Sequence, residues 1–445
     1  MTFTKIQKKH FQILKDLLFD HLTEDEVASI SIHAEDSDFI RMNQSQVRQA
    51  THVQQIDFKI KLEYKKKQIS NSFSGTGDLH SDKQSLLKIL ERCRQNILQL
   101  PDDPHFIPME NNGHSDMELE ADRPTVTEVI SIIARHSKNC DLAGIYCAGP
   151  IIQADANSLG QNHWFATDQY FFDYSIYRGP KAAKGFVSDI HWNTKHLEHS
   201  IDHTLKFLDQ LSLPEQKIQP GKYKCYLDPA AVAELLGTMS YGGFSQQSFQ
   251  LGHSPFRKLG DKSITLSPLF SLQENYEMGL APKFNSLGEV CENHISLIHK
   301  GEWIQFLTST RTAKEYHLRS NFADSNEFLR STEISPGTLK ENEILKALGT
   351  GFYLSNLHYC NWSDMQSARM TGMTRFACFW VEDGQIKGPI SDLRFDVSLY
   401  EVFGENLLGV TQNQELFPNI GTHYARGLGG FKVPGMLVKD FNFTL

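Results

Sequence analysis

The sequence contains no apolar run of the roughly 18 residues that a membrane-spanning helix requires. It also has no excess of positive charge, because 44 Lys and Arg residues against 53 Asp and Glu residues give a net charge of −9. Non-specific binding of nucleic acid needs a basic surface that displaces counterions from phosphates, so this charge balance argues against direct nucleic-acid binding. The first ten residues lack an apolar signal core, which predicts a cytoplasmic protein without membrane association.

Several catalytic and metal-binding strings are also missing. The seven cysteines form no CxxC pair, and their spacing matches no zinc framework or disulfide scaffold, which favours a reducing compartment. The zinc-protease string HExxH, the Gly-x-Ser-x-Gly elbow and the phosphate-binding P-loop are absent as well. The simplest signatures of a hydrolase or a nucleotide-binding protein are therefore excluded.

The chain has 445 residues, which is too long for one compact core and suits two. Helical and strand patterns alternate in the first half, and strand patterns dominate the second half, which predicts the α+β class. Pro214 and Pro220-Gly221 break the chain between the two halves. We therefore expect an N-terminal domain of antiparallel sheet plus helices over 1–217 and a C-terminal strand-rich domain over 218–445.

In the N-terminal half, apolar residues at helical or alternating spacing mark the elements. Ser81 and Gln84 predict a capping box at the start of the second helix. The acidic stretch 101–123 is expected to be an exposed loop. The predicted helices are 5–20, 81–97, 125–135 and 191–211, and the predicted strands are 28–33, 39–42, 56–64, 143–147 and 166–177.

In the C-terminal half, Asp228-Pro229 predicts a helix start, since the carboxylate can accept N–H groups of the first turn and proline is favoured there. The helix should cover 230–239, and one more helix is expected near 340–348. Asp383-Gly384 suits a type I′ turn, which predicts a hairpin over 376–386. The remainder is expected to be strands and turns, and the run Gly427–Gly430 is expected to be a loop packed against other backbone.

Histidine is the residue type that most suggests a metal, with 19 in the chain. His196, His199 and His203 fall within roughly 60° of one another on a helix. The opposite stripe contains Leu197 and Ile201 and should be the buried one, so the histidines are expected to face solvent without a metal. The residues alone therefore predict a two-domain α+β protein and leave its activity open.

Four segments in order carry a family resemblance: 297–314, 348–357, 376–390 and 395–403. The third reads Phe376-Ala-Cys-Phe-Trp-Val-Glu-Asp-Gly-Gln-Ile386 and continues to Pro389-Ile390. In these segments the chain resembles the TldD/PmbA family, in which PmbA is also called TldE. The resemblance implies a two-domain TldD/PmbA-like architecture. It also implies a link to zinc-dependent cleavage of flexible peptides, in which TldD is the catalytic chain and PmbA its metal-free partner.

The zinc signature of that family is a helical HExxxH followed by a cysteine near the C-terminus. The matching stretch here is 233–238, with Ala233 and Thr238 at the histidine positions and Glu234 at the glutamate. The cysteine position falls near His423. The resemblance therefore implies no metal or cofactor in this chain, with zinc only in a catalytic partner. Glu234 is either a vestigial general base or an ordinary helix residue.

The leading interpretation is a PmbA-like, non-catalytic subunit of a TldD/PmbA-type zinc peptidase. Its expected partners are a TldD-like catalytic subunit and an unfolded peptide, in a homodimer or heterodimer. One alternative is a self-sufficient metallopeptidase with non-standard ligands, with Glu234 and His423 as the first to test. Another is a regulator of the DNA-gyrase-modulator type, which would bind a protein rather than DNA.

Overall fold

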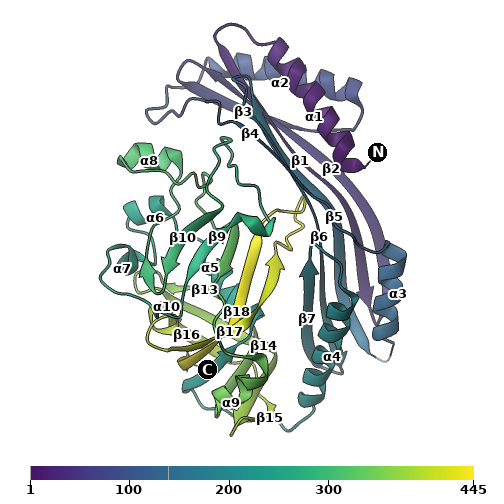
Figure 1. Cartoon of the computed structure of the whole chain (residues 1–445), viewed down its shortest axis with the longest axis vertical. Helices are drawn as coiled ribbons and strands as arrows, with labels where there is room; N and C mark the ends of the chain where they lie inside the picture. Colours follow the sequence, from purple (N-terminus) through teal and green to yellow (C-terminus); the bar gives the residue numbers. More distant parts are fainter. Residues whose placement is uncertain (1, 139, 445) are drawn as a thin grey trace.

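A computed structural model describes residues 2–138 and 140–444, and the strands in these ranges form two sheets. The first sheet comes from the N-terminal half and is long and curved. The second comes from the C-terminal half and lies on the concave side of the first (Figure 1). The predicted α+β class is confirmed. The division at residue 217 stays a prediction, although the last strand of the first sheet ends at Asp189 and the next strand begins at Gly221.

The first sheet has the strand order β3-β2-β1-β5-β6-β4, and β7 pairs with β6 next to β4. Its ladders are antiparallel except the parallel pair of β4 and β6. The strands are β1 (Glu26–Asn43), β2 (Gln46–Tyr64), β3 (Lys67–Ser74), β4 (His114–Leu119), β5 (Asp141–Asn157), β6 (Asn162–Arg178) and β7 (Lys181–Asp189).

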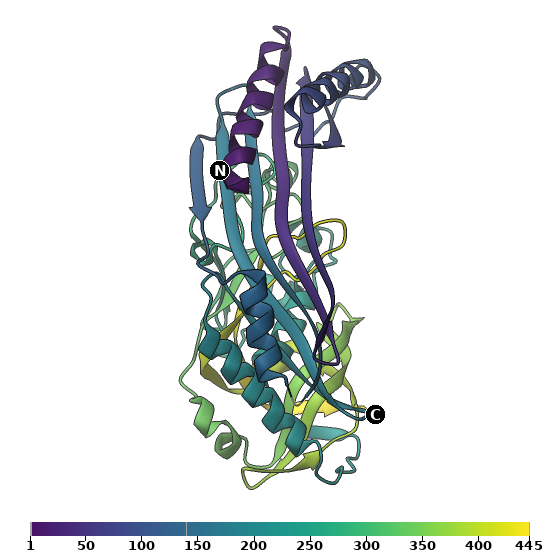
Figure 2. The same cartoon turned by 90° about the vertical axis from the view of Figure 1, so that its right-hand side faces the viewer.

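Four helices cover the outer face of this sheet, as Figure 2 shows: α1 (Phe3–Asp20), α2 (Leu79–Ile97), α3 (Val126–His136) and α4 (Thr194–Gln210). Alternation along the strands explains the two faces. Even-numbered residues such as Ile30 and Ile60 are fully buried in the cluster that contains Leu14 of α1 and Leu90 of α2. Several odd-numbered residues of the same strands are polar, and Ser29, Ser31, Lys59 and Lys61 face loops of the C-terminal half.

The second sheet is mixed and has the order β11-β10-β9-β12-β18-β16-β14-β13-β8. Because β8 also pairs with β18, the strands β18, β16, β14, β13 and β8 close into a ring. The strands are β8 (Gly221–Leu227), β9 (Leu272–Asn275), β10 (His294–His299), β11 (Glu302–Trp303), β12 (Ser331–Ile334), β13 (Gly351–Asp364), β14 (Arg369–Glu382), β15 (Gln385–Pro389), β16 (Arg394–Ser398), β17 (Leu407–Pro418) and β18 (Gly430–Phe443).

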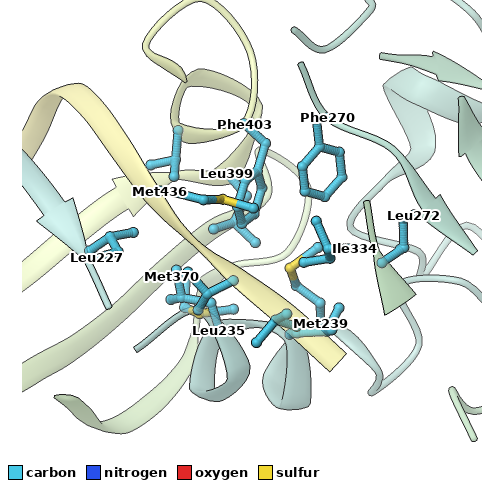
Figure 3. Close-up of a cluster of buried hydrophobic side chains, with 14 of the residues drawn as sticks. Leu227, Leu235, Met239, Phe270, Leu272, Ile334, Met370, Leu399, Phe403 and Met436 are labelled. Carbon is cyan, nitrogen blue, oxygen red and sulfur yellow. The ribbon is translucent and has the colours of Figure 1, made fainter. Parts of the chain in front are cut away.

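Helix α5 (Pro229–Met239) packs on this ring. Its Leu235 and Met239 lie among Met370 of β14 and Met436 of β18, and all four are almost fully buried (Figure 3). Each such side chain contributes about 1.5–3 kcal/mol of burial free energy, so the core fixes which face of α5 remains for other contacts. The shorter helices are α6 (Gln246–Gln250), α7 (Arg257–Gly260), η1 (Tyr276–Met278), α8 (Thr310–Tyr316), η2 (Glu341–Glu343), α9 (Ile344–Leu348) and α10 (Leu399–Val402).

Several local predictions for the N-terminal half need correction. The strands expected at 28–33 and 39–42 are one strand, β1, because β2 pairs with it throughout. The stretch 101–123 is not only an exposed loop, since β4 lies within it and pairs with β6. Ser81 does not begin α2: Asp78 is the N-cap and accepts the Ser81 N–H at 2.9 Å, because aspartate caps as well as serine and stands one turn earlier.

In the C-terminal half, the hairpin with Asp383-Gly384 is confirmed, and both residues have the positive φ that a type I′ turn needs. The helix near 340–348 is divided into η2 and α9, and the additional short helices α6, α7, α8 and α10 went unpredicted. Each of these helices is seven residues or shorter, too short for a helical pattern to stand out. None of the described helices is long and apolar enough to cross a membrane.

Candidate functional site

A cleft of about 850 Å³ lies between the two sheets. Strand β7 and helix α4 form one wall, and α5, β13, β14 and β17 form the other. Successive side chains of β7 point to opposite faces of the first sheet. Ala183 and Val187 are buried on the helix-covered face, so Lys184 and Phe186 point into the cleft. The cleft therefore arises from the packing of the two halves against each other.

Helix α5 presents Ala233, Glu234, Gly237 and Thr238 to this cleft. These positions lie on one helix face because the opposite stripe is buried in the core described above. The Thr238 hydroxyl donates to the Glu234 carbonyl oxygen at 3.3 Å, so its proton is engaged by the helix backbone. A Cβ at Gly237 would meet only the Phe431 ring, at 3.8 Å, which leaves the cleft side of α5 open.

Asp228 immediately precedes α5 and also lines the cleft. The helix begins at Pro229 as the sequence predicts, but the Asp228 carboxylate does not cap it. It accepts the Tyr353 hydroxyl hydrogen at 2.5 Å instead. Burial raises the pKa of Asp228 to about 7, although this hydrogen bond acts in the opposite direction. Desolvation and the neighbouring Asp228 also raise the pKa of Glu415, which projects from β17.

Basic groups share the cleft with these acids, Lys184 from the β7 wall and His358 and Arg375 from the same wall as α5. Desolvation by the protein walls raises the pKa of Glu234, while the charges of His358 and Lys184 oppose that rise. Arg375 of β14 lines the cleft beside Phe376, with its guanidinium 5.2 Å from the ring centre. Phe376 has a φ of 62°, a conformation that is unusual for a non-glycine residue and is held here by the surrounding sheet.

The four predicted site residues do not all come together. Ala233, Glu234 and Thr238 lie side by side on α5, whereas His423 does not line the cleft. His423 lies in the exposed first part, 419–424, of the loop 419–429, where its ring packs against Tyr424 with 4.2 Å between centres. Within residues 2–138 and 140–444, no group of three His, Cys, Asp or Glu side chains is placed to hold a metal ion.

Sequence reasoning missed two histidines of the cleft. His203 was expected to face solvent with His196 and His199. It lines the cleft from α4 instead, because that helix lies beside the second sheet. His196 and His199 are exposed, as predicted. No pattern in the sequence indicated His358 of β13, since its position in the cleft depends on the bulges that shift the register of β13 against β14.

The loop 419–429 is anchored by Arg426, a residue that sequence reasoning also missed. Its side chain is 2% exposed and inserts into the first sheet where β1 and β5 are unpaired around Asp36 and Ser37. The guanidinium donates to the Ser37 hydroxyl at 3.2 Å and to the carbonyl oxygens of Gly149 and Gln169 at 2.9 and 3.1 Å. One wall of the cleft is thereby tied to the other half of the molecule.

Glycines close this loop against neighbouring backbone, as the sequence predicts. A Cβ at Gly429 would lie 2.6 Å from the Arg330 carbonyl oxygen, and one at Gly430 would lie 2.5 Å from that of Phe417. Gly429 also has a φ of 106°, which other residues rarely adopt. The run is therefore a close backbone contact.

The fold is shared by solved structures of low sequence identity. One is TldE from Thermococcus kodakarensis, with a TM-score of 0.75, 13% identity, and coverage of 99% of this chain and 100% of that chain. Two others are provisionally named modulators of DNA gyrase. The Thermotoga maritima structure has a TM-score of 0.75 and the Bacteroides thetaiotaomicron structure one of 0.77, each at 15% identity with both chains fully covered.

These likenesses define the fold, and the sequence defines the family. The family described as "PmbA/TldA metallopeptidase C-terminal domain" matches residues 220–445, which is half of the chain. The protein therefore belongs to the PmbA/TldD family, as its resemblance predicts. A search of curated protein sequences found no match.

Proposed function

We propose that this chain is the PmbA-like, non-catalytic subunit of a TldD/PmbA-type zinc peptidase and holds an unfolded peptide for a zinc-bearing partner. The observation that carries this proposal is the composition of the α5 face in the cleft. At the positions of HExxxH it offers Ala233, Glu234 and Thr238.

A catalytic zinc site takes about three protein ligands and an open position for water. Alanine has no donor atom, and the Thr238 hydroxyl is neutral and bonded to the helix backbone. His423 lies outside the cleft. Within residues 2–138 and 140–444, no group of three His, Cys, Asp or Glu side chains, with or without Glu234, is placed to hold a metal ion. These residues do not fit zinc, and the zinc chemistry of the complex is therefore assigned to the partner.

The cleft offers extended backbone to a peptide. Strand β7 pairs only with β6 among the described strands, so its edge toward the cleft is available. The end of β17 lies close by, because the Ser188 hydroxyl of β7 donates to the Leu416 carbonyl oxygen at 2.5 Å. A peptide that adds to such an edge is bound through its main-chain hydrogen bonds, which depend little on its sequence. The aromatic rings of Phe186, Phe328 and Phe417 beside these edges would contact its side chains.

The alternative proposal is a self-sufficient peptidase, and one observation favours it. Glu234 shares the cleft with His358 and Lys184, whose charges act on it. A carboxylate beside an imidazole could serve as a general base if a metal were held by further residues. A third proposal, regulation of a DNA-binding protein, rests only on the provisional names of two similar structures.

Metal analysis of the purified proteins separates the first two proposals. We expect less than 0.1 zinc per chain when this protein is purified alone. We expect about one zinc per pair when it is co-purified with a TldD-like chain that has an intact HExxxH. A partner whose two HExxxH histidines are replaced by alanine is the matched control and should form the pair without zinc. Stoichiometric zinc in this chain alone would remove the non-catalytic assignment.

A further inference from the structure

A second cavity, of about 380 Å³, lies against the first sheet, and no residue of α5 lines it. It is formed by the polar, odd-numbered face of β1, β2 and β5 and by loops of the C-terminal half, including the start of α8. Figure 1 shows loops of the C-terminal half on the concave side of the first sheet, to which β1 and β5 belong. The cavity is a place where the two halves meet without filling the space between them.

Two lysines dominate this cavity. Lys59 and Lys61 are two residues apart on β2 and therefore point to the same side. Each is directly opposite a serine of β1, because Ser31 pairs with Lys59 and Ser29 pairs with Lys61. All four side chains line the cavity, so two ammonium groups and two hydroxyl groups converge on one space.

Neither lysine has a hydrogen bond or an ion pair with another residue in the described ranges. The nearby Arg311 differs, since its guanidinium is bound by the Asp103 carboxylate at 2.6 Å. Burial lowers the pKa of Lys61, and Lys59 acts in the same direction, whereas the carboxylates of Asp155, Glu63 and Asp324 act against it. These carboxylates act on Lys61 without an ion pair to either lysine in the described ranges, so a bound anion would give the ammonium groups a direct partner.

The remaining wall can accept such an anion. Asp155 is 7% exposed, and its carboxylate accepts the Gln161 amide hydrogen at 2.6 Å. Burial raises its pKa to about 7, so near neutral pH a large share of this carboxyl group is protonated and able to donate. A smaller cavity of about 80 Å³ shares Ser29, Lys61 and Asp155, which extends the space beside the two lysines.

We propose that this cavity binds a small molecule with a multiply charged oxyanion, either a phosphate monoester or a dicarboxylate. Lys59 and Lys61 are its charge partners, and the hydroxyls of Ser29 and Ser31 donate hydrogen bonds to it. Two ammonium groups that are two residues apart on one strand suit a doubly charged group better than a single carboxylate. Its lining residues differ from those of the peptide cleft, although alternate residues of the segment 323–326 line the two cavities, and the proposal requires no zinc in either chain.

The test is isothermal titration calorimetry on the full chain at constant ionic strength. The probes are inorganic phosphate, glycerol 3-phosphate and succinate. We expect saturable binding, one ligand per chain, of at least one probe. The variants Lys59→Gln and Lys61→Gln should each weaken that binding at least tenfold. The matched control Lys66→Gln removes the same charge from the exposed turn after β2 and should change it less than twofold.

The probes also distinguish the two ligand classes. Binding of phosphate and glycerol 3-phosphate without succinate assigns a phosphate monoester, and preference for succinate assigns a dicarboxylate. Far-UV circular dichroism confirms that each variant is folded. Lys59 is largely exposed, so its variant keeps the test decisive even if Lys61→Gln perturbs folding. Absence of saturable binding by all three probes, or binding that Lys59→Gln leaves unchanged, overturns the proposal.

Discussion

Replacing Arg426 by methionine tests whether one buried side chain holds the cleft loop onto the first sheet. The guanidinium donates to Ser37, Gly149 and Gln169. The Ser37 hydroxyl in turn donates to the Glu35 carboxylate at 2.6 Å, and Glu35 also accepts the Arg426 backbone N–H at 3.1 Å. Glu35 is 1% exposed, so arginine and glutamate are the opposite charges of one buried network, joined through the Ser37 hydroxyl rather than by a direct ion pair.

The expected loss follows from these contacts. A hydrogen bond to a charged group contributes about 1.5–3 kcal/mol, but methionine also removes the cost of burying the guanidinium. Removing one partner of a buried charge pair costs about 3–5 kcal/mol, because the other charge stays uncompensated. We therefore expect Arg426→Met to lower the free energy of unfolding by about 3 kcal/mol. The double variant with Glu35→Gln should recover part of that loss, since no buried charge then remains unpaired.

The assay is urea unfolding followed by tryptophan fluorescence, together with amide hydrogen exchange of the loop 419–429. The control is Arg178→Met, which breaks a largely exposed ion pair with Asp209 and should cost less than about 1 kcal/mol. Exchange in the loop should accelerate only in the Arg426 variant. A loss within 1 kcal/mol of the control, with unchanged loop exchange, would refute the anchoring role of Arg426.

Four further predictions address the cleft and the buried acids. The double variant Ala233→His, Thr238→His restores both histidines beside Glu234 and should retain zinc after dialysis, measured by mass spectrometry, whereas Thr238→His alone should not. Glu234→Gln should change peptide cleavage by the two-chain complex less than twofold, and a tenfold loss would assign Glu234 a catalytic role. Gly429→Ala should lower the thermal midpoint through about 1–3 kcal/mol of strain, because its φ of 106° and the Arg330 carbonyl oxygen leave no room for a methyl group. The raised pKa of Asp155, from 3.8 to about 7, means that the folded state holds the proton more tightly, so stability should fall as pH rises from about 4 to about 7. In urea unfolding, Asp155→Asn should reduce the change in the free energy of unfolding between pH 4 and pH 7, by no more than about 4 kcal/mol.

Local signals in the sequence predicted the elements whose formation depends on neighbours in the chain. The Asp383-Gly384 turn and the Pro229 helix start are examples, because turn and first-turn preferences act over a few residues. Strand β4 was missed because its partner is distant: His114 pairs with Asn162 in a parallel ladder. The acidic composition around it favours a loop when that partner is unknown.

The candidate site divides in the same way. The face of α5 could be predicted, since the family motif and the helix period place Ala233, Glu234 and Thr238 together. The participation of His203 and the burial of Arg426 could not, because both depend on how the two halves pack. An arginine in a glycine-rich stretch is usually an exposed residue, and only the gap between β1 and β5 accounts for its burial.

The central claim is that this chain does not cleave peptides by itself. Its most direct test is the initial rate of hydrolysis of an unstructured, fluorescence-quenched peptide by the purified chain with added zinc, with and without a TldD-like partner. The account predicts no hydrolysis by this chain alone, and hydrolysis by the pair that disappears when the glutamate of the partner's HExxxH is replaced by glutamine. Zinc-dependent hydrolysis by this chain alone would contradict it.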